Sequence, residues 1–211
     1  MTDGTQPTRP AAAVFLDRDG VINELVWDED DDRYESPLRA EDVELMPGAV
    51  DAIARLQAAG LELVVVSNQP AAAKGKTTLG ELRAVHERVV GLLADGGTTV
   101  DNWRYCFHHP DAELAELRVI CRCRKPQPGM LIDSAQEKGI DLQRSWIVGD
   151  SDADVGAGSA AGCKTVLVEH KRSEHRREGS VDPDARVPDV AAAASLIISI
   201  AQPPDSVGLD D

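Results

Sequence analysis

Short aliphatic runs alternate with helical patterns along most of this chain, and this alternation limits the possible folds more than any other feature of the sequence. Buried strands are predicted at 11–16, 61–66, 103–107, 145–148 and 165–168. Helical spacing of apolar residues follows Gly48 and recurs at 77–93, 129–138, 155–161 and 189–200. Strands that are joined through helices usually pair in parallel. We therefore expect an α/β fold with one doubly wound parallel sheet.

Composition and length limit the size and content of the core. Aromatic residues make up only 3% of the chain, so Ala, Val, Leu and Ile must fill most of the interior. The 211 residues are enough for one well-buried core and too few for two large domains. We expect a single domain over 11–200, disordered tails at 1–10 and 201–211, and an exposed, irregular loop over 169–187.

The strong acidity of the chain narrows the classes of partner. A formal net charge of −15 argues against DNA, RNA or an anionic membrane as the main partner. No apolar run is long enough to cross a bilayer, and residues 1–10 lack the apolar segment of a signal peptide. We expect a cytoplasmic monomer. A small phosphorylated substrate would need a local group of cations to bind so acidic a chain.

Reactive side chains follow three of the predicted strands at the points where those strands end. Asp17 and Asp19 follow the first strand, Ser67 and Asn68 the second, and Asp150 the fourth. The carboxyl ends of parallel strands lie at one edge of the sheet, where ligands bind. One polar strand end is compatible with an ordinary turn, but three at the same edge indicate a site.

Each motif has an ordinary alternative when it is considered alone. Asp17–Gly20 is compatible with a turn, and Lys125 with a solvated loop lysine. The Asp-x-Asp-x-Asp run that begins at Asp150 fits the start of a calcium loop, but it lacks the Gly and Glu that an EF-hand has at its sixth and twelfth positions. Asp152 and Asp154 are also compatible with capping of the next helix.

Taken together and in order, the motifs resemble those of the haloacid dehalogenase (HAD) superfamily of phosphohydrolases. The resemblance covers residues 14–168 and rests on Asp17-Arg18-Asp19, Ser67, Lys125 and the segment 149–154. It implies a Rossmann-like HAD domain and a Mg²⁺-dependent phosphomonoesterase that works through an aspartyl-phosphate intermediate.

The resemblance also implies a role for each residue. Asp17 is the expected nucleophile, and Asp19 the acid that protonates the leaving oxygen and then activates water. Ser67 and Lys125 are expected to hold the phosphoryl oxygens. Asp150 is expected to complete a Mg²⁺ site with Asp17 and the main-chain carbonyl of Asp19. Electrostatics agree, because two carboxylates about 4 Å apart repel by roughly 4 kcal/mol at an effective dielectric of about 20, and a cation relieves that repulsion.

Three of the four cysteines are close in sequence, which favours a metal site in a reducing compartment over a disulfide framework. The predicted ligands, all in the loop 104–124, are Cys106, His108, Cys121 and Cys123. Three thiolates and one imidazole form a closed tetrahedral shell for Zn²⁺, and closed shells are structural. His109 is an alternative fourth ligand, and three buried free cysteines are the alternative to any metal.

The same loop resembles the zinc loop of the heptose 1,7-bisphosphate phosphatases and of their relatives, the histidinol-phosphate phosphatases. The pattern is Cys-x-His-His at 106–109 and Cys-x-Cys-Arg-Lys-Pro-x-Pro-Gly-Met at 121–130. The resemblance favours His108 as the fourth ligand. Because Cys123 directly precedes Arg124 and Lys125, zinc would fix the backbone that directs Lys125 toward the phosphate.

One helix and the zinc loop fill the chain between Ser67 and Lys125, so we expect an open site without a large cap domain. The expected substrate-binding residues are Asn68, Lys74 and Arg124. The basic residues near the site, including Lys76, suit a second phosphate. The expected reaction is hydrolysis of the C7 phosphate of D-glycero-D-manno-heptose 1,7-bisphosphate.

Two alternatives to this function stay open. One is a histidinol-phosphate phosphatase, and the other is a noncatalytic, zinc-stabilised protein that binds phosphosugars. Two departures from the family pattern bear on the substrate. Residues 70–73 replace a Gly-containing stretch, and Ser151 stands where the heptose enzymes often have Lys.

Overall fold

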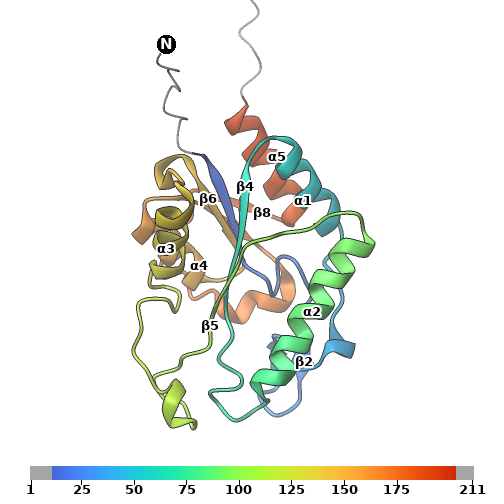
Figure 1. Ribbon diagram of the computed structural model, residues 1–211, viewed down its shortest axis with the longest axis vertical. Helices are drawn as coiled ribbons and strands as arrows, with labels where there is room; N and C mark the ends of the chain where they lie inside the picture. Colours follow the sequence, from blue (N-terminus) through green and yellow to red (C-terminus); the bar gives the residue numbers. More distant parts are fainter. Residues whose placement is uncertain (1–10, 203–211) are drawn as a thin grey trace, which may run out of the picture.

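Six parallel strands form the central sheet, in the order β5-β4-β1-β6-β7-β8 (Figure 1). The computed structural model describes residues 11–202, so the tail predicted at 1–10 lies outside the described residues, as does most of the tail predicted at 201–211. That second tail was predicted to begin too early, because Ala201 still belongs to the last helix. The strands are β1 (Ala13–Leu16), β4 (Glu62–Asn68), β5 (Trp103–Cys106), β6 (Trp146–Gly149), β7 (Lys164–Val168) and β8 (Ala185–Val187). The five predicted strands are present, β8 adds a sixth, and the predicted parallel α/β fold is confirmed.

Helices cover both faces of this sheet, with α1 and α5 on one side and α3 and α4 on the other (Figure 1). The α-helices of the described region are α1 (Ala49–Ala58), α2 (Leu79–Asp95), α3 (Gly129–Lys138), α4 (Asp152–Ala161) and α5 (Val190–Ala201). Short 3₁₀ turns lie at η1 (Ala40–Asp42), η2 (Ala115–Leu117), η3 (Leu142–Arg144) and η4 (Lys171–Arg176). Between residues 11 and 202, no helix is both long and apolar enough to cross a membrane.

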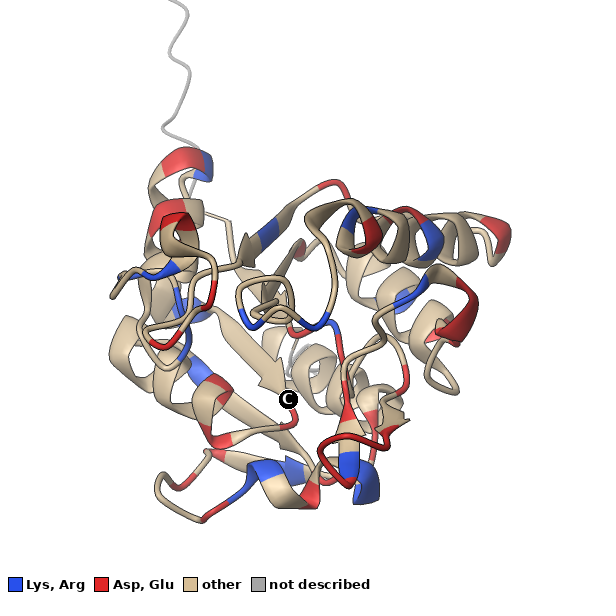
Figure 2. Cartoon of the chain, turned by 90° about the horizontal axis from the view of Figure 1, so that it is seen from below, with Lys and Arg blue, Asp and Glu red and all other residues tan. Residues whose placement is uncertain are grey.

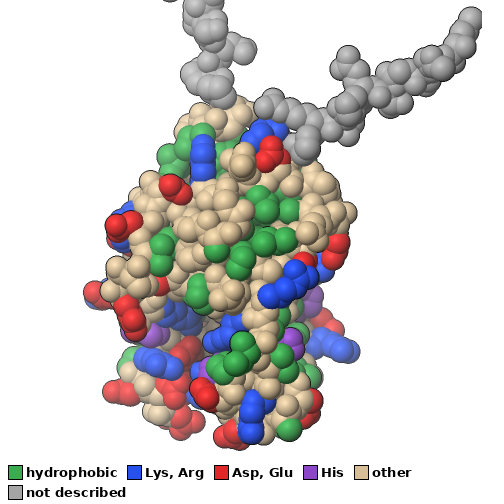
Figure 3. Space-filling view, turned by 90° about the vertical axis from the view of Figure 1, so that its left-hand side faces the viewer, with side chains coloured by type: hydrophobic (Ala, Val, Ile, Leu, Met, Phe, Trp, Pro, Cys, Tyr) green, Lys and Arg blue, Asp and Glu red, His purple; other side chains and the backbone are tan. Residues whose placement is uncertain are grey.

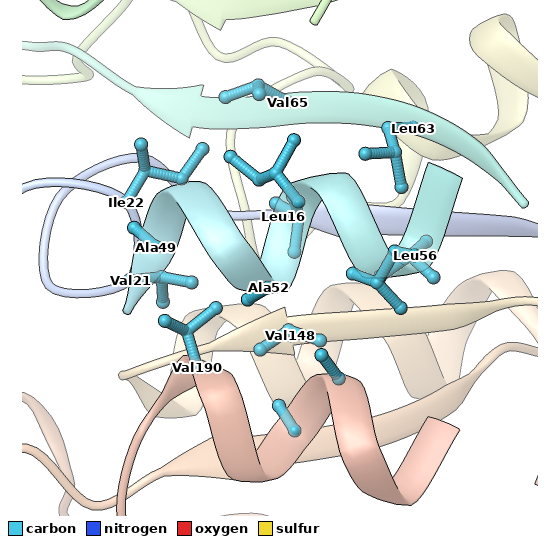
Figure 4. Close-up of a cluster of buried hydrophobic side chains, with 14 of the residues drawn as sticks. Leu16, Val21, Ile22, Ala49, Ala52, Leu56, Leu63, Val65, Val148 and Val190 are labelled. Atoms are coloured by element: carbon cyan, nitrogen blue, oxygen red, sulfur yellow. The ribbon is translucent and has the colours of Figure 1, made fainter. Parts of the chain in front are cut away.

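Side chains of β1 alternate between two cores, one on each face of the sheet. Val14 and Leu16 pack in the larger core with α1, α2 and α5, which Figure 4 shows in part. Ala13 and Phe15 pack in the smaller core with α3 and α4, and the fourth cysteine, Cys163, is buried there as a small apolar residue. Because both faces of β1 are buried, the strand end that carries Asp17 is held firmly in place.

The acidic run at 28–32 forms the end of one strand and the exposed turn of a short antiparallel hairpin. Its strands are β2 (Val26–Asp28) and β3 (Arg33–Glu35). Lys76 holds the turn, with its Nζ 2.7 Å from a carboxylate oxygen of Asp28 and 2.7 Å from one of Asp31. Strands of three residues are too short to show a hydrophobic period, so the sequence pattern did not reveal the hairpin.

The prediction of an exposed, irregular loop at 169–187 is wrong. The segment contains η4 and β8, and β8 pairs with β7 as the edge strand of the sheet. Arg177 attaches η4 to the sheet by donating hydrogen bonds to the carbonyl oxygens of Asp150, Val168 and His170. The high charge of this segment reflects inward ion pairs as well as solvation.

The packing of α5 against the sheet predicts unequal effects of two substitutions in that helix. Ile197 is fully buried in the larger core, whereas Ile200 is 44% exposed. Ile197→Ala is expected to lower the free energy of unfolding by roughly 2–5 kcal/mol, through lost burial and a cavity. Ile200→Ala should lower it by less than about 1 kcal/mol. Urea denaturation of both variants checks this, and equal losses would contradict the described packing of α5.

Candidate active site

Three carboxylates meet at the carboxyl edge of the sheet, which Figure 2 shows from below. Asp17 directly follows β1, and its backbone N–H donates to the Val148 carbonyl at 2.9 Å, which extends the β1–β6 pairing. Asp150 directly follows β6, and Asp154 lies in the first turn of α4. Oxygen atoms of these three side chains lie within 4.8 Å of one another. The ends of β1 and β6 and the start of α4 therefore bring three carboxylates close together.

Lys125 brings an ammonium group to the same point. Its Nζ lies 2.9 Å from Asp17 Oδ1 and 2.5 Å from Asp154 Oδ1. Burial opposes the charge of this ammonium group, but the charges of Asp154 and Asp17 raise the pKa of Lys125 above its usual value. Asn68 fixes the backbone here: its amide oxygen accepts from the Lys125 N–H, and its amide N–H donates to the Lys125 carbonyl.

Asp154 does more in this group than cap a helix, which was one of the alternatives that the sequence left open for it. One oxygen binds Lys125, while the other accepts hydrogen bonds from the Ser151 hydroxyl and backbone N–H in a capping box. The available signal was its position four residues after Asp150, which returns a side chain to the same side of the chain at a helix start. Asp154 therefore connects Lys125 to the start of α4.

Asp150 is fully buried, and neither of its carboxylate oxygens has a hydrogen-bond partner in the described part of the chain. Burial raises the pKa of Asp150 to about 7, although Arg176 opposes this rise. Gly20 presses against this carboxylate with φ at +88°, a position where a Cβ would collide with the acid. Only glycine fits there, because it has no side chain and tolerates positive φ.

The charges of this group match a divalent cation. Asp17, Asp150, Asp154 and Lys125 together carry a net charge of −2 when all are ionised. Burial, assisted by the nearby charge of Asp154, raises the pKa of Asp17 to about 6 against the opposing influence of Lys125. Buried carboxylates without hydrogen bonds are costly. Carboxylate oxygens are also the ligands that Mg²⁺ prefers, so the group can hold such an ion.

Asp19 is directed into a different network. The Arg18 guanidinium donates to both of its oxygens at 3.0 Å, and the side-chain amides of Asn23 and Gln69 donate to one oxygen each. Burial raises the pKa of Asp19, but Arg18 and these hydrogen bonds lower it below its usual value overall. The described arrangement therefore stabilises the anionic form of Asp19, and its carboxylate is not one of the three that converge, which are those of Asp17, Asp150 and Asp154.

A cavity of about 330 Å³ opens over Asp17 and Asp19, whereas Asp150 and Asp154 are not among its lining residues. The predicted site residues along its wall are Asp17, Asp19, Ser67, Asn68, Lys74, Arg124 and Lys125. Lys76 lines a neighbouring groove instead, where it is paired with the hairpin turn. Residues of the wall that the sequence did not reveal are Arg33, Glu35, Ser36, His175 and Arg176, and Ser151, which departs from the family pattern, also lines it. Figure 3 shows a hollow in the lower part of the molecule with basic side chains around it.

The predicted cysteine loop forms a second cluster. The three sulfur atoms of Cys106, Cys121 and Cys123 lie 3.2–3.5 Å apart, and His108 Nδ1 lies 3.4 Å from Cys123 Sγ and 3.8 Å from Cys106 Sγ. Disulfide sulfur atoms are about 2.05 Å apart, so these cysteines are free thiols. A tetrahedral zinc site with Zn–S of about 2.3 Å separates its sulfur atoms by about 3.8 Å, close to this spacing.

The ligand atoms of this cluster face one another, so the four side chains can hold a metal ion. Burial raises the pKa of Cys121, but hydrogen bonds from Cys123 and the Arg124 backbone lower it to about 6 overall, which favours a thiolate. The His109 ring faces elsewhere and accepts a hydrogen bond from the Asp111 backbone. The structure thus places His108, and not His109, beside the sulfur atoms.

Comparison with known proteins gives consistent matches. A family model described as HAD-hydrolase-like matches residues 122–193. A D-glycero-beta-D-manno-heptose-1,7-bisphosphate 7-phosphatase from Rhodopseudomonas palustris is 41% identical over 156 residues, which cover 74% of this chain and 81% of that protein. A relative of the same name from Pseudomonas putida is 40% identical over 186 residues, which cover 88% of this chain and 98% of the relative.

Among solved structures, a similar one is the crystal structure of D,D-heptose 1,7-bisphosphate phosphatase from B. bronchiseptica, complexed with magnesium and phosphate. It matches with a TM-score of 0.74 and 32% sequence identity, over 90% of this chain and 99% of that chain.

The raised pKa of Asp150 predicts how an uncharged replacement changes stability. Folding raises the pKa of this carboxyl group from about 4 to about 7. As the pH rises through this interval, the unfolded chain loses the proton more readily than the folded protein does, so the free energy of unfolding falls. In buffer without divalent cations, Asp150→Asn is therefore expected to raise the free energy of unfolding relative to wild type at pH 8, and to raise it less at pH 5. Urea denaturation at both pH values measures this. An equal effect at pH 5 and pH 8 would show that the buried negative charge of Asp150 does not lower the free energy of unfolding.

Proposed function

This chain belongs to the HAD phosphatase family that includes the D-glycero-beta-D-manno-heptose-1,7-bisphosphate 7-phosphatases, and from that premise we propose that it hydrolyses the C7 phosphate of D-glycero-D-manno-heptose 1,7-bisphosphate. The observation that carries the proposal is the buried group at the sheet edge, in which Asp17 contacts Lys125 and lies beside Asp150. A nucleophile, a phosphate-binding cation and a metal-binding acid are the parts that phosphoryl transfer requires.

Asp17 and Asp150, with the main-chain carbonyl of Asp19, are the proposed Mg²⁺ ligands. The unpartnered oxygens of Asp150 support this assignment, since a cation would satisfy both. When bound, Mg²⁺ neutralises the buried acids and polarises the phosphoryl group. Asp154, which is already bonded to Lys125 and Ser151, positions that lysine instead of joining the reaction.

In the first proposed step, a carboxylate oxygen of Asp17 attacks the phosphorus atom in line with the sugar oxygen that leaves. The new bond is the acyl-phosphate O–P bond, and the bond that breaks joins phosphorus to the sugar oxygen. Lys125 and the Ser67 hydroxyl, both on the cavity wall, hold the other phosphoryl oxygens. Dividing the displacement in this way replaces one difficult step by two easier ones.

Asp19 supplies and recovers the proton. It protonates the leaving sugar oxygen, and then removes a proton from the water that hydrolyses the aspartyl-phosphate, which regenerates Asp17 and releases phosphate. The ion pair with Arg18 favours the Asp19 anion before substrate binds. A phosphate dianion that enters the cavity raises the pKa of Asp19 by like-charge repulsion, and so favours the protonated acid at the stage where it is needed.

Zn²⁺, held by Cys106, His108, Cys121 and Cys123, is the proposed structural metal. The mutual approach of one nitrogen and three sulfur atoms supports this assignment. The zinc loop continues directly into Arg124 and Lys125, and Arg124 Nη1 also donates to the His108 carbonyl at 3.4 Å. The metal therefore helps to direct both cations into the cavity.

The charges of the cavity wall favour a substrate with a second phosphate. Lys74 and Arg124 line the wall in addition to Lys125, and among the described lining residues basic side chains other than histidine outnumber acidic ones. A second phosphate suits these cations better than the amine of histidinol phosphate does. In residues 11–202 the site is completed by short loops without a large cap domain, which leaves room for a sugar with two phosphates.

We further propose that the protein acts as a cytoplasmic monomer. All the acids and cations of the site come from one chain. The cluster of free thiols also suits a reducing compartment, where cysteines bind metal more often than they form disulfides.

The proposed nucleophile gives the most direct test of this function. Asp17→Asn is expected to lower Mg²⁺-dependent phosphate release from heptose 1,7-bisphosphate by about 10³-fold or more, because an amide cannot form the acyl-phosphate. Asp51→Asn, at an exposed position on α1, is the matched control and should keep wild-type activity.

The same phosphate-release assay should compare the bisphosphate with its two monophosphates and with histidinol phosphate. We expect kcat/KM to be highest for the bisphosphate. Preference for histidinol phosphate would contradict the substrate assignment, and full activity of Asp17→Asn would contradict the mechanism.

Removal of one zinc ligand tests the coupling between the two sites. Cys121→Ser is expected to lose bound zinc, measured by atomic absorption, together with most phosphatase activity, because the backbone at Lys125 is no longer fixed. Cys163→Ser, in the smaller core away from the cluster, should keep its zinc. A Cys121→Ser variant that is free of zinc and fully active would refute the coupling.

A further inference from the structure

Arg176 brings a cation to the catalytic cavity from a segment that the family motifs do not cover. It is the last residue of η4, and only 18% of its side chain is exposed. It lines the cavity together with Asp17 and Lys125. Burial of a guanidinium lowers the stability of the fold unless the positive charge has a partner, so the partners of Arg176 indicate its role.

Two acids face Arg176, and they hold it differently. Its Nη2 lies 3.2 Å from Glu35 Oε2, a hydrogen-bonded ion pair. Its Nη1 lies 3.7 Å from Asp150 Oδ2, which is beyond hydrogen-bond distance, and neither carboxylate oxygen of Asp150 accepts a hydrogen bond from the described residues. Glu35 thus anchors the guanidinium, while the donors directed toward Asp150 stay available for another oxygen.

Glu35 also orients a second guanidinium. Its Oε1 lies 2.7 Å from Arg33 Nε, so one carboxylate of β3 holds Arg33 and Arg176 side by side along the cavity wall. A guanidinium presents several N–H groups in a fixed plane, which suits the oxygens of a phosphate. The hairpin β2–β3 therefore contributes to the wall through this Arg33–Glu35–Arg176 triad.

The segment that follows Arg176 is hydrogen-bonded to the loop at 150–152. The adjacent Arg177 donates to the Asp150 carbonyl at 3.3 Å and to Ser173 Oγ at 2.8 Å. Beyond it, Asp152 Oδ2 accepts hydrogen bonds from the backbone N–H groups of Glu178 and Ser180. These contacts hold the guanidinium in place before any ligand binds, which lowers the entropic cost of using it.

Lys125 alone does not supply all the hydrogen-bond donors that a transferred phosphoryl group can use. Its ammonium group is already bonded to Asp17, Asp154 and the Val66 carbonyl. Phosphoryl transfer spreads negative charge over three equatorial oxygens, which more than one positioned cation can stabilise. Arg176 approaches the acids from η4, on a different segment from Lys125, and so can contact a different oxygen.

We propose that Arg176 is a catalytic residue that binds the oxygens of the transferred phosphoryl group, with Glu35 as the positioning residue that directs it into the cavity. This inference rests on the proposed phosphatase function and adds a specific contact to it. The guanidinium donates hydrogen bonds and takes no part in proton transfer, since arginine stays protonated.

The test measures both turnover and the binding of inorganic phosphate. With Mg²⁺ present, Arg176→Gln is expected to lower kcat for heptose 1,7-bisphosphate by about 10²-fold or more, and to raise the Kd for inorganic phosphate by at least about tenfold in titration calorimetry. Arg176→Lys, which keeps the charge but not the planar fork, should give intermediate values.

The matched control is Arg172→Gln on the same 3₁₀ turn. Arg172 pairs with Glu24 and donates to the Leu25 carbonyl outside the catalytic cavity, so its loss tests whether loosening η4 is enough to produce the effect. Phosphate binding by Arg172→Gln should stay within about twofold of wild type. A loss in both variants would overturn the specific role of Arg176.

A separate titration with Mg²⁺ distinguishes binding of phosphate from an effect on the metal ligand. Because Arg176 places a positive charge near Asp150, its removal should leave the Kd for Mg²⁺ unchanged or lower it. Unchanged phosphate affinity in Arg176→Gln, or a loss of Mg²⁺ affinity in parallel with phosphate affinity, would overturn the proposal. Phosphate binding does not depend on the sugar, so failure of the heptose substrate would contradict the proposed function without contradicting the role of Arg176.

Discussion

Burial of like charges at the ends of β1 and β6 is the physical constraint on which the rest of the site depends. Asp17 and Asp150 lie almost out of solvent and within 4.8 Å of each other and of Asp154. In the protein alone, Lys125 offsets part of the repulsion and raised pKa values accommodate much of the rest. A divalent cation bound there would remove the imbalance and allow a phosphate dianion to approach, as we propose.

The segments around these acids position basic side chains at the cavity. Asn68 holds the backbone at Lys125 through two hydrogen bonds, and Glu35 of β3 holds Arg176 at the end of η4. An acidic chain can bind a phosphorylated substrate because five Lys and Arg side chains line this cavity against three acids, although acids outnumber basic residues in the chain as a whole. The net charge of the chain therefore does not predict the ligand, whereas the arrangement of charged side chains around the cavity does.

The sheet and its catalytic edge could be predicted because each strand, and the acid that follows it, is formed by residues that are adjacent in the sequence. The aliphatic run before Asp17 predicts β1 and also the edge to which that acid is delivered. Arg176 and Asp154 were missed because their importance depends on contacts across 26 and 29 residues, with Asp150 and Lys125 respectively. The β2–β3 hairpin was missed because its strands are too short to show a period, and its acidic turn has the composition of a loop.

The most direct test of the account is the linkage between Mg²⁺ and inorganic phosphate, measured as the phosphate Kd at increasing Mg²⁺ concentrations. If the cation neutralises Asp17 and Asp150, phosphate should bind at least about tenfold more tightly at saturating Mg²⁺ than without it, and this difference should disappear in Asp150→Asn. A phosphate Kd that is the same with and without Mg²⁺ would contradict the claim that charge neutralisation at this edge makes the site.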